Sequence, residues 1–221
     1  MKTCDSIRDE FKTKSGRKEV ARAIEAVFEH LPPEKILITM YADKSEYNGQ
    51  TLGEIAEIEN SRPCASYVDM VCEKQSPMGV FFDQEIDIIR TLMAGDNIIT
   101  VSDGWPVSKD TAKPHPRLYG TFPRKLRKFA IEEKILSVSQ AVRSMTSMPA
   151  DQFNLKDRGR LAKDHFADIA VINPETITDR ATYKSAHQYS EGVAHLFVNG
   201  VQAIKNGKAT GDRGGRALKR A

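Results

Sequence analysis

The sequence predicts an α/β protein in two parts: strand–helix units over residues 1–155, then a small antiparallel β region over residues 156–221. Two short apolar runs, 35–41 and 97–102, support the first part because they lack polar alternation. Such runs are typical of strands buried on both faces in a parallel sheet. Segments with helical spacing of apolar residues surround both runs, as in repeated strand–helix units.

The pattern changes after Gly159. Residues 160–173 and 194–205 alternate like strands, and Asn199-Gly200 between apolar neighbours predicts a two-residue β-hairpin turn. The tail, 207–221, is rich in Gly and Arg and is expected to be loose. These features predict the antiparallel β region.

Capping residues and prolines set the expected helix limits. Thr51 with Glu54 predicts a capping box, and Ser137 is expected to cap a second helix. Asp83 is expected to cap a third helix, which Gly95 would close. The expected helices are 17–30, 51–60, 63–73, 84–94, 122–134, 138–147 and a short one within 149–155, with loops at 74–82 and 105–120.

Composition excludes several classes of protein. The 33 Lys+Arg against 30 Asp+Glu leave a formal net charge of +3, which argues against a dedicated nucleic-acid binder. The basic clusters at 123–128 and 213–220 are therefore interpreted as solvated surface. No apolar run approaches a membrane span. The three cysteines form no CxxC pair, and the charged N-terminal stretch resembles no signal peptide, so we expect a cytoplasmic protein.

The end of the second apolar run is the first candidate site. Ser102-Asp103-Gly104 follows it directly, and ligand sites of parallel α/β proteins lie at the carboxyl ends of strands. A carboxylate there can ligate a metal or act as a general base. The alternative is structural: Asp103 caps the following turn, for which Gly104 supplies the geometry.

A longer stretch points to a family. Residues 98–124, which contain the block His115-Pro116-Arg117-Leu118-Tyr119-Gly120-Thr121-Phe122-Pro123-Arg124, resemble the last-strand region of the N-acyl-D-amino-acid deacylases (D-aminoacylases) of the amidohydrolase superfamily. The likeness extends over about 30–221, through segments such as 145–150, 157–161, 167–171 and 195–200. It implies the C-terminal portion of a metal-dependent-hydrolase TIM barrel, with its last two β/α units, plus a share of a small β-domain.

The resemblance also implies a chemistry. It is that of a hydrolase that cleaves the linear amide of an N-acyl-D-amino acid with the help of Zn²⁺, which polarises the carbonyl and acidifies water. Asp103 matches the family's catalytic aspartate, a proton shuttle. Arg117 matches the arginine that grips the substrate carboxylate, to which a guanidinium can bond bidentately. A surface arginine held beside Pro116 is the alternative for Arg117.

The family's metal ligands are missing. No His-x-His occurs, and His30 is the sole histidine before Val101. His115 matches no ligand of the family, and His165, His187 and His195 are expected in structural roles. We therefore expect a truncated or split deacylase that is inactive unless a complementary N-terminal barrel half is supplied. The alternatives are a non-catalytic module that pairs with another chain and a dihydropyrimidinase-like amidohydrolase.

Overall fold

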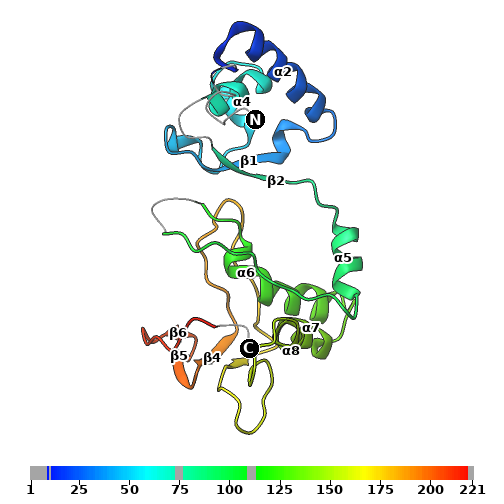
Figure 1. Ribbon diagram of the computed structural model, residues 1–221, viewed down its shortest axis with the longest axis vertical. Coiled ribbons are helices and arrows are strands. Elements are labelled where there is room, and N and C mark those ends of the chain that lie inside the picture. Colours follow the sequence, from blue (N-terminus) through cyan, green and yellow to red (C-terminus); the bar gives the residue numbers. More distant parts are fainter. Residues whose placement is uncertain (1–8, 10, 73–76, 109–112, 219–221) are drawn as a thin grey trace. The chain divides into compact units, whose positions relative to one another are not determined.

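The computed structural model describes residues 9, 11–72, 77–108 and 113–218. The chain forms two compact units (Figure 1). Unit 1 comprises Met1–Gln84 and Pro106–His115, and unit 2 comprises Glu85–Trp105 and Pro116–Ala221. Within the described ranges, every helix is too short or too polar to cross a bilayer.

The described residues of unit 1 include helices α2, α3 and α4 and a short two-stranded sheet. Helix α2 (Lys14–Phe28) packs on α4 (Pro63–Cys72), which also packs on α3 (Leu52–Ile58). The predicted capping box is confirmed, because the Glu54 N–H donates to Thr51 Oγ1 and the Thr51 N–H donates to Glu54 Oε2. Short 3-10 turns, η1 (Pro33–Lys35) and η2 (Ser45–Tyr47), flank the first strand.

Strand β1 (Ile36–Met40) confirms the first apolar run as a strand, but its pairing differs from the prediction. It pairs antiparallel with β2 (Met78–Phe81), a strand in the segment expected to be a loop. On the other edge the Ile38 N–H donates to the Gln50 carbonyl, and the Gly49 N–H donates to the Ile38 carbonyl. The expectation of a parallel strand was wrong here, since nearby segments of the same unit occupy both edges.

The core of unit 1 explains why β1 has no polar alternation. Tyr41, Leu52 and Ile55 are at most 1% exposed and lie in one apolar cluster with Ile36 and Ile38. Full burial of such a side chain contributes about 1.5–3 kcal/mol. The strand is thus buried by its own helices and turns.

Unit 2 contains a nearly continuous helical stretch with a change of helix type inside it. Helix α6 (Arg117–Arg124) runs directly into the π-helical segment η3 (Lys125–Glu132). Pro123 lies inside α6 and has no N–H for the Tyr119 carbonyl four residues earlier. Ser190 Oγ donates to that carbonyl instead, at 2.7 Å.

The remaining helices of unit 2 are α5 (Ile86–Ala94), α7 (Val138–Met145) and α8 (Ser147–Gln152). The predicted cap at Ser137 is confirmed, as is the end of α5 before Gly95, and Gln140 completes a capping box with Ser137 that was not predicted. Asp83 does not cap α5, which begins after Glu85 without a side-chain cap. Apolar residues of α5 and α7 meet those of η3 in one cluster around Leu126, Phe129, Leu136, Ala141 and Ile177.

The C-terminal sheet of unit 2 confirms the antiparallel prediction. Its order is β3 (Ile169–Ile172), β4 (Val193–Val198), β5 (Val201–Lys205) and β6 (Lys208–Ala209). Asn199 and Gly200 have φ of +50° and +82°, as a type I′ turn requires. Beyond β6, Asn199 Nδ2 donates to the Gly214 carbonyl at 2.6 Å, and the Arg216 guanidinium lies over the Phe166 ring.

Candidate functional site

The two residues singled out by sequence, Asp103 and Arg117, lie together in unit 2. Arg117 Nη2 is 2.7 Å from Asp103 Oδ2, and Arg117 Nε donates to the Asp103 backbone carbonyl at 3.0 Å. One guanidinium thus engages both the carboxylate and the backbone of the same residue. The Asp103 side chain is 79% exposed and that of Arg117 45% exposed, so solvent reaches the pair.

A tight turn brings the pair together. Asp103 has φ +45°, in the left-handed region, and the Gly104 N–H donates to Ser102 Oγ at 3.3 Å. A Cβ at Gly104 would lie 3.0 Å from the Leu118 Cα, so glycine permits this close approach to the first turn of α6. The Asp103 carboxylate contacts Arg117, and the Gly104 N–H bonds Ser102 Oγ rather than Asp103, so the capping role of Asp103 stays a prediction.

The segment before Asp103 corrects the sequence prediction. Residues 97–102 form no strand, because no described segment pairs with them: Asn97 belongs to a turn, and residues 98–102 have no regular secondary structure. Thr100 donates its N–H to the Ser144 carbonyl at 3.0 Å, whereas the N–H groups of Ile99 and Val101 meet no acceptor within the described ranges. Val101 is 61% exposed. Asp103 thus follows a segment with unpaired backbone N–H groups, rather than a buried strand.

The start of α6 also corrects the prediction. The loop expected over 105–120 ends earlier, since Arg117 is the first residue of α6. Arg117 therefore lies in the first turn of a helix that continues into η3, whose Leu126 and Phe129 belong to the core of unit 2.

The histidines do not form a metal site. His187 Nδ1 is 2.9 Å from Tyr119 Oη, His195 Nδ1 is 3.2 Å from Gln202 Nε2, and His165 Nδ1 is 3.3 Å from the Lys163 carbonyl. His115 belongs to unit 1. Across the part of the chain that is described, no three His, Cys, Asp or Glu side chains gather as metal ligands. A catalytic Zn²⁺ needs about three protein ligands, so these residues do not fit one.

Tyr119 is the centre of an aromatic cluster beside Arg117. Its ring meets Tyr189 edge-on at 5.4 Å and His187 at 5.9 Å between centroids. Burial, with a smaller effect from Tyr189, raises the pKa of the Tyr119 hydroxyl. The cluster ties the segment around residue 188 to α6, and sequence reasoning missed it because the partners are about 70 residues apart.

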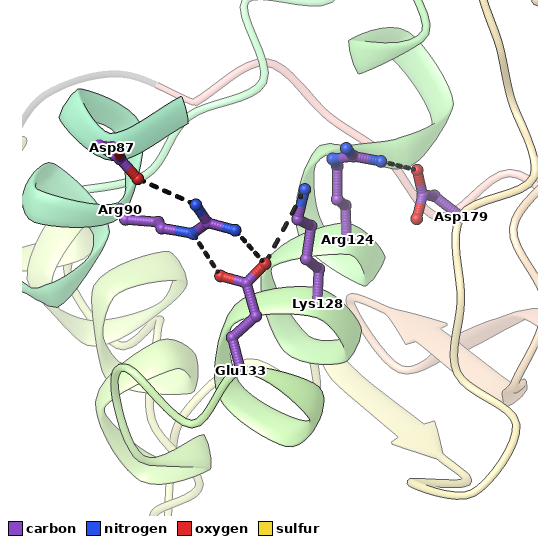
Figure 2. A network of polar contacts seen from close by, with 6 residues as sticks. All are labelled: Asp87, Arg90, Arg124, Lys128, Glu133 and Asp179. Carbon is purple, nitrogen blue, oxygen red and sulfur yellow. Dashed lines mark hydrogen bonds and ion pairs between the residues drawn. The ribbon is translucent and has the colours of Figure 1, made fainter. Parts of the chain in front are cut away.

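Ion pairs connect several elements of unit 2 (Figure 2). Arg90 on α5 bonds Glu133 with two nitrogens, at 2.9 and 3.1 Å, and donates to Asp87 at 2.9 Å. Hydrogen bonding by Arg90 lowers the pKa of the Glu133 carboxyl. Arg124 of α6 pairs with Asp179 at 3.1 Å. The basic cluster at 123–128 is thus partly engaged in ion pairs within the unit.

One member of that cluster is buried. Lys125 is 1% exposed, and its Nζ donates to Thr100 Oγ1 at 2.7 Å. The interpretation of 123–128 as a solvated face was wrong for this residue. The helical register could have revealed it, because Lys125 lies four residues before Phe129 on the face that enters the core.

Comparison with known proteins agrees with the motifs. The sequence matches the Amidohydrolase family over residues 65–204. The chain belongs to this family. It is 34% identical to a D-aminoacylase of Alcaligenes xylosoxydans xylosoxydans over 187 residues, covering 84% of this chain and 37% of that protein. An N-acyl-D-glutamate deacylase of the same organism is also 34% identical, covering 84% of this chain and 36% of its own length.

Solved structures extend the likeness to three dimensions. A crystal structure of D-aminoacylase superposes with a TM-score of 0.75 at 28% identity, covering 92% of this chain and 46% of the other. The N-acyl-D-glutamate deacylase from Bordetella bronchiseptica, complexed with zinc and a phosphonate inhibitor, gives 0.71 at 28% identity, covering 80% and 37%. The predicted likeness to D-aminoacylases is therefore confirmed, and this amidohydrolase chain spans less than half of these relatives.

Metals occur in the structures of these relatives. Zinc is present in the deacylase complex, and a D-aminoacylase has a binuclear metal centre; a D-aminoacylase mutant is known in complex with copper chloride. The link between the family and zinc is thus confirmed. The residues described in this chain offer no matching ligand group, so we derive no step through a metal.

Proposed function

We propose that this chain supplies the Asp103–Arg117 part of a hydrolase for the linear amide of N-acyl-D-amino acids. The observation that carries the proposal is the contact between these two residues, which lie 14 positions apart and converge on one turn. Both belong to the stretch that resembles the D-aminoacylases. The relatives named as deacylases of D-amino acids support the substrate class.

The two side chains suit different parts of such a substrate. An ionised carboxylate at Asp103 can accept a proton from water and return it to the leaving nitrogen. The Arg117 guanidinium can bond a substrate carboxylate through two nitrogens and keeps its charge at all relevant pH values. In this chain Arg117 bonds Asp103 instead. A substrate carboxylate would therefore have to displace Asp103 before either residue could act.

We further propose that activity requires a complementary barrel half. The metal ligands expected for the family are absent from this sequence, and the segment 97–102 has backbone groups that a neighbouring strand could pair. The chain would then be a truncated or split member of the family.

A test is to assay the purified chain with N-acetyl-D-methionine and Zn²⁺, alone and mixed with the separately produced N-terminal portion of a D-aminoacylase. We expect turnover only in the mixture, and its loss in Asp103→Ala. Asp212→Ala, at an exposed aspartate of the tail, is the matched control and should keep the activity. Turnover by the chain alone, or an active Asp103→Ala mixture, would contradict the proposal.

The second candidate is a non-catalytic module that pairs with another chain. The same open segment favours it, because unpaired strand-like backbone is a template for pairing. In that case the chain would bind the N-terminal portion, as seen by size-exclusion chromatography with light scattering, and the complex would show no turnover. Binding with turnover favours the hydrolase.

A further inference from the structure

Unit 2 contains a buried amine that the proposed chemistry does not use. Lys125 begins the π-helical segment η3 and is 1% exposed, in a stretch where Leu126, Phe129 and Ala130 are also buried. Lysine is almost never fully buried without a partner, because removing an ammonium from water is costly. A buried lysine therefore requires a physical explanation.

Its polar contact leads to the candidate site. Lys125 Nζ donates to Thr100 Oγ1 at 2.7 Å, and Thr100 is itself buried. Thr100 lies three residues before Asp103, and its own N–H donates to the Ser144 carbonyl in α7. This contact joins η3 to the segment that leads to Asp103, and it involves neither Asp103 nor Arg117.

Charged groups on η3 and on the elements around it bond one another or the backbone. Glu133 bonds Arg90 and Asp179 pairs with Arg124 (Figure 2), and Arg143 Nη1 donates to the Asp96 carbonyl. No carboxylate lies within ion-pair distance of Lys125 among the residues described. Burial accordingly lowers the pKa of the Lys125 amine.

We propose that Lys125 is a positioning residue: through Thr100, its side chain fixes the segment that leads to Asp103. Besides this contact, the segment is held by the Thr100 N–H bond to the Ser144 carbonyl and by Arg117 at Asp103, whereas the Ile99 and Val101 N–H groups find no acceptor in the described chain. The Lys125 amine thus holds the segment in place through a side-chain hydrogen bond, where a complete sheet would hold it through backbone hydrogen bonds to a neighbouring strand. The inference rests on the proposed function only for the role of Asp103.

The positioning role of Lys125 can be tested without an activity assay. A negative result would therefore count against this role and not against the proposed function. Hydrogen exchange of the Thr100 amide reports on the segment, because this N–H bonds α7. In Lys125→Met, which keeps an apolar stem of similar length, we expect the protection of Thr100 to fall roughly three- to tenfold, the equivalent of about one hydrogen bond. Thr100→Val should give a similar loss at the same amide.

Three comparisons make the test specific. The double variant Lys125→Met/Thr100→Val should lose no more protection than either single variant, because both remove the same contact. Thr100→Ser keeps the hydroxyl and should retain most of the protection. Lys128→Met, at a partly exposed lysine of the same helix, should leave the Thr100 amide unchanged.

A titration separates this role from simple space filling. Because burial lowers the pKa of the folded Lys125 amine, the unfolded state binds more protons only between that lowered pKa and the unfolded value of about 10.4, and stability rises with pH through this window. Lys125→Met should remove this slope, and ¹³Cε NMR should show Lys125 titrating below its ordinary value. Unchanged Thr100 protection in both single variants, or an ordinary Lys125 titration, would overturn the proposal.

Discussion

The two apolar runs of this chain resemble each other in sequence and differ in structure. Ile36–Met40 becomes strand β1 with antiparallel neighbours on both edges. Residues 97–102 form no strand: the N–H groups of Ile99 and Val101 meet no acceptor in the described chain, and Val101 is exposed. The difference lies in the neighbours: β2 and the turn at 49–51 reach β1 within unit 1, whereas no described segment pairs with the second run.

An apolar run in a sequence indicates that its residues can be buried, but it does not specify which strand they pair with. A strand forms only where another segment completes its hydrogen bonds. For β1 the partner lies within about 40 residues. For 97–102 we propose that it lies in the portion of the family's barrel that this chain does not span.

The largest expected effect contrasts the two runs directly. Ile38→Ala removes a side chain that is 3% exposed and should cost about 2–5 kcal/mol of unfolding free energy. Val101→Ala, at 61% exposure, should change it by less than about 0.5 kcal/mol. Urea unfolding followed by circular dichroism measures both. Equal losses would mean that 97–102 is buried, against this account.

An intermediate effect on the unfolding free energy is expected at Ser190, whose hydroxyl donates to a backbone carbonyl that has lost its helical N–H partner. Ser190→Ala removes the donor to the Tyr119 carbonyl and should cost about 1 kcal/mol. Pro123→Ala restores an N–H at that point of α6, so the double variant should recover part of the loss. The same urea titration, analysed as a double-mutant cycle, measures this. Purely additive losses would show that the two groups do not share the carbonyl.

The Arg90–Glu133 network should give unit 2 a pH dependence. The lowered pKa of Glu133 means that its stabilisation is present above the unfolded value of about 4.3 and is lost as pH falls through the folded pKa. Glu133→Gln should weaken this acid sensitivity, measured as the urea midpoint at several pH values. Glu175→Gln, at an exposed glutamate, is the control and should keep the wild-type profile.

The smallest effect on stability is expected at the candidate site. Arg117→Gln breaks an exposed ion pair and should change the unfolding free energy by at most about 1 kcal/mol. In the complemented assay proposed above, the same variant should lose most of its turnover at low substrate concentration. A large stability loss with full activity would assign Arg117 to the scaffold.

Local features were predictable where one stretch of chain determines them. The capping box at Thr51, the cap at Ser137 and the Asn199-Gly200 turn follow from short-range hydrogen bonding and backbone preference, and all are confirmed. The sequence also placed Asp103 and Arg117 in one site through the family's motif. Their contact depends on the close approach at Gly104 and on the first turn of α6, which the sequence had placed in a loop.

Features that depend on distant partners were not predictable. Strand β2 pairs with a segment about 40 residues away, and its short apolar stretch carries no signal of its own. Lys125 was interpreted as solvated because charge dominated the local pattern, whereas the core face of η3 decides its burial. Residues 97–102 have no strand to pair with in the described chain. Whether such a partner exists depends on other segments, so the run itself does not reveal it.

The most direct test of the account is hydrogen exchange at the Ile99, Val101 and Asp103 amides, with and without the separately produced N-terminal portion of a D-aminoacylase. We expect exchange near the intrinsic rates in the chain alone and at least about tenfold protection in the mixture, as strand pairing forms. Strong protection in the isolated chain, or unprotected amides in a mixture that turns over substrate, would contradict the claim that this segment awaits a partner strand.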